Sequence, residues 1–119
     1  MLLNDFYTCH DMANSDLSVN CTIEFNAGHA IFGGHFPGNP VVPGVCMMEI
    51  VKELLQEQVK EPLLLRKSGN IKFLQLITPG IKPTIKIEWK RSDDGYVVKA
   101  SMSQGEIIHF KFDGTYGIV

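Results

Sequence analysis

One stretch of the chain, residues 34–49, limits its fold more than any other. It reads Gly-His-Phe-Pro-Gly-Asn-Pro-Val-Val-Pro-Gly-Val-Cys-Met-Met-Glu. Proline fixes φ and glycine reaches conformations that other residues avoid, so the first part of the stretch predicts a shaped, irregular loop. Pro43 and Gly44 then predict a helix entry, because proline suits the first helical turn, and Val45 to Gln58 contains no glycine or proline.

Two side chains of this stretch, His35 on the loop and Glu49 in the second helical turn, suggest acid/base chemistry. An imidazole, a carboxylate and the free N–H groups of a helix start are the parts of such a site. His35 alone is also typical of a surface or packing residue. The sequence allows two interpretations of Glu49. In the first, its apolar neighbours predict a buried carboxylate that needs a function or a partner. In the second, Glu49 lies on a solvated helical face, which it shares with Lys52, Glu53, Gln56 and Lys60.

Length and composition indicate one globular domain over residues 1–119 with one core. The net charge of −2 gives no case for nucleic acid. No long apolar run predicts a membrane span, and the N-terminus has no signal-peptide pattern, so we expect a cytoplasmic protein. The odd, widely spaced cysteines (Cys9, Cys21 and Cys46) argue against a disulfide framework and predict free thiols.

The rest of the chain predicts strands rather than further helices. Alternation of apolar and polar residues predicts strands over 17–25, 84–90, 96–103 and 106–112, with others at 70–77 and 115–119. Residues 1–16 show no clear element, and 66–69 reads as a turn after a short apolar run at 63–65. A helix of this length can cross a sheet, so the predicted class is α+β, mostly antiparallel, with the helix on one face.

Residues 34–49 resemble the signature of the β-hydroxyacyl-acyl-carrier-protein dehydratases, a hotdog-fold family. The pattern G-H-F-P-G-x-P-x-x-P-G-V, with an acid fourteen residues after the histidine, matches without a gap. A second match runs from Asn70-Ile71-Lys72-Phe73 to Thr78-Pro79-Gly80, and the resemblance extends roughly over residues 26–116. It implies a hotdog fold, in which a curved antiparallel sheet wraps around one long central helix.

The resemblance also implies roles for site residues in removing water from a 3-hydroxyacyl thioester. His35 would take the proton from C2, since an imidazole has a pKa of about 6.5, and Glu49 would serve as the acid if burial raises its pKa. The Gly44 amide would bind the thioester oxygen. The other substrate-binding residues expected are Val45, Phe36, Pro43 and Met48. No cofactor is implied, and a zinc site from His29, His35, Cys46 and Glu49 matches no familiar spacing.

The partners implied are an acyl carrier protein bearing the thioester and a second copy of the chain, with the histidine and acid of one site coming from different subunits. Family members often carry paired arginines where Leu74-Gln75 stand, so coenzyme A remains an alternative carrier. Nearby cations could compensate: Arg66, Lys67, Lys72, Lys82 and Lys86. A hotdog thioesterase and a non-catalytic acyl-binding partner subunit of a hotdog heterodimer remain alternative functions.

Overall fold

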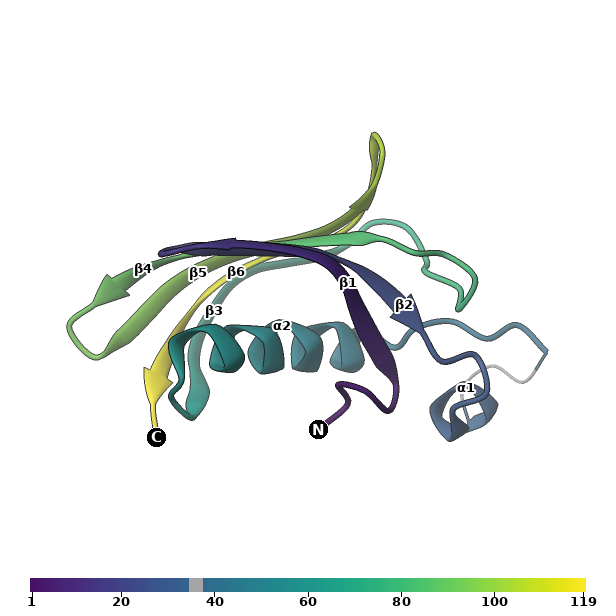
Figure 1. Cartoon of the computed structure of the whole chain (residues 1–119), viewed down its shortest axis with the longest axis horizontal. Helices are drawn as coiled ribbons and strands as arrows, with labels where there is room; N and C mark the ends of the chain where they lie inside the picture. Colours follow the sequence, from purple (N-terminus) through teal and green to yellow (C-terminus); the bar gives the residue numbers. More distant parts are fainter. Residues whose placement is uncertain (35–37) are drawn as a thin grey trace.

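The computed structural model describes residues 1–34 and 38–119, in which a six-stranded antiparallel sheet curves over one long helix (Figure 1). The strand order in the sheet is β1-β2-β4-β5-β6-β3. The strands are β1 (Tyr7–Ser15), β2 (Ser18–Phe25), β3 (Leu63–Phe73), β4 (Thr84–Ser92), β5 (Gly95–Gln104) and β6 (Ile107–Ile118). The helices are α1 (Ala30–Gly34) and α2 (Gly44–Val59). The predicted α+β class, with the helix on one face of the sheet, is confirmed.

The core lies between the concave face of the sheet and α2. Alternation in the strands sends one set of side chains toward the helix, as in β4, where Ile85, Ile87 and Trp89 are buried and the residues between them are exposed. From the helix side, Ile50 and Leu54 are among the residues that meet them. With 16 residues α2 is about 24 Å long, enough to cross several strands.

The helix limits follow from backbone chemistry at its two ends. Pro43 is the N-cap, with an extended backbone, and Gly44 begins the helix one residue before the predicted start. Lys60 is the C-cap in the left-handed conformation, and its N–H donates to the Gln56 carbonyl, which ends the helix at Val59. The sequence had predicted the end at Gln58.

The prediction of no element over residues 1–16 is wrong, because residues 7–15 form the edge strand β1. An edge strand buries little, and β1 shows no alternation: only Tyr7 is buried, and the last six of its nine residues are exposed. A bulge between His10 and Ala13 interrupts the pairing with β2, and Asp11 takes a positive φ there. The apolar periodicity that reveals central strands is therefore absent.

The segment predicted as a turn, residues 66–69, is also different: it lies inside β3, which begins at Leu63 and ends at Phe73 rather than at Ile77. Its pairing with β6 shifts register twice, at Leu65/Lys67 and at Ser68/Ile71, and continues on both sides of each shift. The strand therefore accommodates the glycine and the charged residues of this segment without ending. β3 is the second edge of the sheet, so one of its sides has no neighbouring strand among the described residues.

The other elements lie close to their predicted limits. β2 starts one residue after the predicted 17–25, and a tight turn at Asp93-Asp94 joins β4 to β5 as expected. The segments predicted separately at 106–112 and 115–119 are one strand, β6. Residues 30–34, for which no helix or strand was predicted, form the short helix α1.

Candidate active site

The N-terminus of α2 presents backbone donors that the helix itself does not use. The first helical hydrogen bonds run from the Cys46 and Met47 N–H groups to the Pro43 carbonyl, at 3.0 and 3.2 Å. The amides of Gly44 and Val45 precede this ladder, and the helix dipole adds positive potential at the same end. Such a pair of amides can stabilise negative charge on an acyl oxygen.

An apolar cavity of about 600 Å³ lies beside this helix end. One wall is the loop and first turns of α2, and the other is the last part of β3 with the segment that follows it. Its size falls within the range of small-molecule sites, and its lining is mostly hydrocarbon, which suits an acyl chain. The lining residues are Val41, Val42, Pro43, Gly44, Val45, Met47, Met48, Ile71, Phe73, Leu74, Gln75 and Leu76.

Phe73 joins the two walls. Its ring lies against Gly44, close enough that a Cβ at position 44 would be 2.8 Å from the Phe73 Cζ atom. On its other side the ring stacks on Phe110 of β6, with centroids 5.3 Å apart and planes inclined by 26°. Glycine at position 44 therefore permits the aromatic wall to approach the free amide. The sequence indicated this segment through its second motif, but not the contact.

We expect Gly44→Ala to displace the Phe73 ring, because the new methyl group would fall inside van der Waals contact. Phe73 is 52% exposed and can move, so the free energy of unfolding should change by less than about 1 kcal/mol. The displaced ring would change the shape of the cavity beside the Gly44 N–H. The value of kcat/KM for the thioester substrate should therefore fall about tenfold or more. Steady-state kinetics and urea unfolding measure the two effects.

The matched control for Gly44→Ala is Gly80→Ala, since a Cβ at position 80 meets nothing within 4 Å. This variant should retain the kinetics of the unmodified chain. Equal kinetic losses in the two variants would show that the Gly44–Phe73 contact has no special part in the site.

Glu49 lies on α2 near the cavity, and its side chain is partly exposed rather than buried. Its Oε1 atom lies 3.3 Å from the Lys52 Nζ atom, and 37% of the side chain is exposed in the single chain. The carboxylate also acts on groups beneath it: burial first, and then the charge of Glu49, raise the pKa of Tyr116 to about 12. Burial and Glu49 likewise raise the pKa of the Cys46 thiol.

The alternative of a solvated helical face fails at Glu53, which is 1% exposed. Its carboxylate accepts hydrogen bonds from the Leu2 and Leu3 amides and from the Tyr7 hydroxyl, at 2.7, 2.9 and 3.1 Å. Burial and the adjacent carboxylate raise the pKa of Tyr7 above its usual range, so its hydroxyl stays a proton donor. The buried carboxylate of α2 is thus Glu53, which one of the two readings of the sequence had placed on a solvated helical face.

The remaining predicted site residues are distributed as follows. Pro43, Gly44, Val45 and Met48 all line the cavity, Val45 being well exposed and Met48 half-buried. His35 and Phe36 lie outside the described residues, and their assigned roles stay predictions.

His29 has a structural role in the described part of the chain. Its Nδ1 atom accepts from the Ile31 amide at 3.1 Å, and its Nε2 atom lies 3.0 Å from an Asp5 carboxylate oxygen. The ring also packs edge-on against Phe6, with centroids 5.2 Å apart. These contacts join α1 to the N-terminal segment.

A metal centre has no support in the part of the chain that the structure describes, where no group of three or more His, Cys, Asp or Glu side chains could hold an ion. The three cysteines are free thiols. Among the described residues, no helix is long and apolar enough to cross a membrane.

The fold and the cavity at the helix N-terminus define the class of protein, and comparison with solved structures agrees. The dehydratase heterocomplex ApeI:P from Xenorhabdus doucetiae contains a chain that matches with a TM-score of 0.79 at 17% identity, over 93% of this chain and 97% of that one. An uncharacterized protein from Erwinia carotovora subsp. atroseptica matches with a TM-score of 0.66 at 23% identity, over 94% and 92%. The chain has a hotdog fold, as the resemblance implied.

Sequence comparison identifies the family. The model of the ApeI-like dehydratases matches residues 11–110. The 3-hydroxyacyl-[acyl-carrier-protein] dehydratase FabZ of Levilactobacillus brevis is 33% identical over an alignment of 115 residues, and the match covers 89% of this chain and 77% of the relative. FabZ of Lactobacillus helveticus is 31% identical over an alignment of 96 residues, and the match covers 73% of this chain and 65% of the relative. The chain belongs to the ApeI-like dehydratase family. The resemblance to the β-hydroxyacyl-acyl-carrier-protein dehydratases, which the sequence motifs indicated, is confirmed.

Proposed function

We propose that this chain, as one domain over residues 1–119, dehydrates (3R)-3-hydroxyacyl thioesters on an acyl carrier protein to trans-2-enoyl thioesters, in fatty-acid or related lipid biosynthesis. The observation that carries the proposal is the apolar cavity ending at the free amides of Gly44 and Val45. This cavity lies between the two motifs that resemble the dehydratase family. The FabZ relatives, whose name states this reaction, support the same substrate class.

In the proposed mechanism the acyl chain occupies the cavity, with its thioester oxygen at the Gly44 amide. His35 removes a proton from C2, and the electron pair forms the C2–C3 double bond as the C3–O bond breaks. Glu49 supplies the proton that the leaving hydroxyl needs, so that water departs. The amide and the helix dipole stabilise the enolate-like charge on the thioester oxygen.

We further propose that a second copy of the chain completes the site by covering the edge of β3. Long, exposed edge strands with apolar side chains are open to pairing with another chain. Phe73 is 52% exposed and Leu76 is 74% exposed, and both belong to the cavity wall. A partner there would also cover part of Glu49, of whose side chain 37% is exposed in the single chain.

Subunit complementation tests this shared site. A heterodimer of one His35→Ala subunit and one Glu49→Gln subunit, made by co-expression with two affinity tags, should regain about half of the unmodified activity, although each homodimer is nearly inactive. The recovery arises because one of its two sites keeps both intact residues if each site draws on both subunits. A heterodimer as inactive as its parents would show that His35 and Glu49 of one site belong to the same subunit.

Two other functions have distinct products. A thioesterase would release a free thiol from the same thioester, whereas dehydration leaves the thiol bound and creates a conjugated chromophore, so a thiol reagent separates the two. A non-catalytic partner subunit would show activity only after mixing with a second hotdog chain. That alternative has support from the structural match, since the Xenorhabdus doucetiae dehydratase is a heterocomplex.

A further inference from the structure

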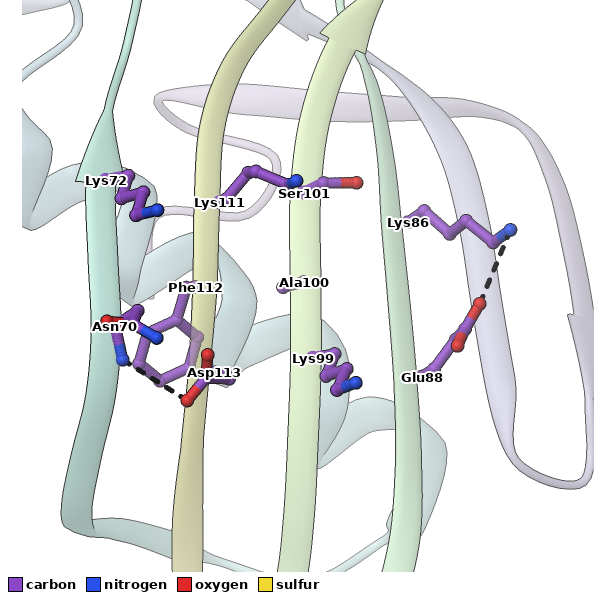
Figure 2. Close-up of a pocket in the computed structure, with 10 residues that line it drawn as sticks. All are labelled: Asn70, Lys72, Lys86, Glu88, Lys99, Ala100, Ser101, Lys111, Phe112 and Asp113. Atoms are coloured by element: carbon purple, nitrogen blue, oxygen red, sulfur yellow. Dashed lines mark hydrogen bonds and ion pairs between the residues drawn. The ribbon is translucent and has the colours of Figure 1, made fainter.

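The face of the sheet that points away from α2 carries a row of four polar residues, one on each of four strands, and three of them are lysines (Figure 2). Lys72 of β3 stands directly opposite Lys111 of β6, Lys111 opposite Ser101 of β5, and Ser101 opposite Lys86 of β4. We call Lys72, Lys111, Ser101 and Lys86 the lysine row. With neighbouring strands about 4.8 Å apart, the row spans about 14 Å.

The lysine row differs from the row next to it. There Asp113, Lys99 and Glu88 stand opposite one another in turn, so positive and negative charges alternate across the strands. Such an arrangement stabilises a sheet surface, whereas like charges directly opposite destabilise it. The Lys72–Lys111 pair therefore has an electrostatic cost that its own sheet does not relieve.

Other carboxylates on this face are already engaged. Glu88 pairs with Lys86, at 3.4 Å between Oε1 and Nζ, and an Asp113 oxygen accepts from the Asn70 amide at 3.2 Å. Among the described residues, Lys72, Lys99 and Lys111 have no carboxylate within ion-pair distance. Lys99 has Asp113 and Glu88 opposite it on the neighbouring strands, whereas Lys72 and Lys111 have no carboxylate opposite them in the described sheet, although the whole chain has a net charge of −2.

The surface between these lysines is hollowed, with a volume of about 360 Å³. Its lining includes Asn70 and the Ser101 hydroxyl, which add neutral hydrogen-bonding groups beside the ammonium groups (Figure 2). The Glu88 and Asp113 carboxylates also line the hollow, and each is already engaged, by the Lys86 ammonium group and by the Asn70 backbone N–H. A hollow of this size accommodates a small molecule, and lysine is a common phosphate ligand because it acts as a point charge. Two phosphate groups would fit ammonium groups on adjacent strands.

We propose that this hollow binds a small molecule carrying at least two phosphate groups, with Lys72 and Lys111 as its main ligands. The site is separate from the proposed catalytic cavity, because the sheet lies between them: Lys72 points outward from β3, and its neighbours Ile71 and Phe73 line the inner cavity. The ligand would remove the repulsion between the two lysines and bind more weakly as salt increases.

Isothermal titration of the purified full chain with inorganic pyrophosphate, and separately with adenosine 5′-diphosphate, tests the site at low ionic strength. We expect saturable binding of one ligand per chain. The double variant Lys72→Gln/Lys111→Gln should weaken it at least about tenfold, since each substitution removes a charge-assisted contact to a phosphate group. Equal affinity for the two probes would show recognition of the phosphates alone, and tighter binding of the nucleotide would show added contacts to the nucleoside.

The matched control is Lys60→Gln/Lys82→Gln, which removes the same charge from residues that do not line the hollow. It should change the affinity by less than about threefold, as expected for a screened long-range effect. Equal weakening in both double variants, or no saturable binding of either phosphate probe, would overturn the proposal. Saturable binding of hexaglutamate without binding of the phosphates would also overturn it, in favour of an acidic protein surface.

Discussion

Replacement of His35 by alanine is expected to lower turnover of a 3-hydroxyacyl thioester by about 10²- to 10⁴-fold, the contribution typical of a general base. The loss should appear in kcat rather than in KM, because the acyl cavity and the Gly44 amide would still bind the thioester. We expect folding to remain intact, since the core among the described residues lies between α2 and the sheet. Stopped assays of enoyl product, with thermal unfolding as a check on folding, measure both.

The control for His35→Ala is His10→Ala. His10 is an exposed histidine of β1, whose ring lies 3.0 Å from a Glu24 oxygen and outside the cavity lining. Its loss should leave turnover unchanged. Near-normal activity of His35→Ala would remove the histidine from the mechanism, and with it the base that the reaction requires.

Loss of the Glu53 carboxylate should cause a large fall in stability for a substitution of a charged helix residue. Glu53→Ala is expected to lower the free energy of unfolding by about 2 to 4 kcal/mol, because it strands the Tyr7 hydroxyl in the core and frees the Leu2 and Leu3 amides. The carboxylate holds the N-terminal segment against the helix, so this segment should also lose protection against amide exchange. Urea unfolding and hydrogen exchange measure the two effects.

Glu57 provides the comparison for Glu53, since it lies one turn further along α2 and is exposed. Glu57→Ala should change the free energy of unfolding by less than about 0.5 kcal/mol. Tyr7→Phe should fall between the two, with a loss near 1 kcal/mol from one hydrogen bond. If Glu53→Ala were no more destabilising than Glu57→Ala, the buried carboxylate would not be holding the N-terminal segment.

Sequence patterns predicted those helices and strands that bury one face and expose the other. The alternation in β2, β4 and β5, and the helix between Pro43 and Lys60, follow from local chemistry that a sequence displays. β1 and the first half of β3 were missed because edge strands are exposed on much of their surface and contain bulges, so the apolar period disappears.

The candidate site also has a part that the sequence predicted and a part that it did not. Pro43, Gly44, Val45 and Met48 were expected from consecutive motif residues, and they line one cavity. The contact of Phe73 with Gly44 and the burial of Glu53 depend on tertiary packing. Helical spacing alone placed Glu53 with Lys52 and Gln56 on a polar face. The lysine row could not be seen, because it depends on the register between strands far apart in the sequence.

The measurement that tests the central proposal most directly is hydration of a trans-2-enoyl thioester, followed as loss of conjugated absorbance. We expect the purified chain to hydrate the thioester on acyl carrier protein without releasing thiol, and His35→Ala to abolish the reaction. A parallel reaction with the coenzyme A thioester would show how strictly the carrier is recognised. Thiol release without hydration, or no reaction with either carrier from a well-folded dimer, would contradict the assignment as a self-sufficient dehydratase.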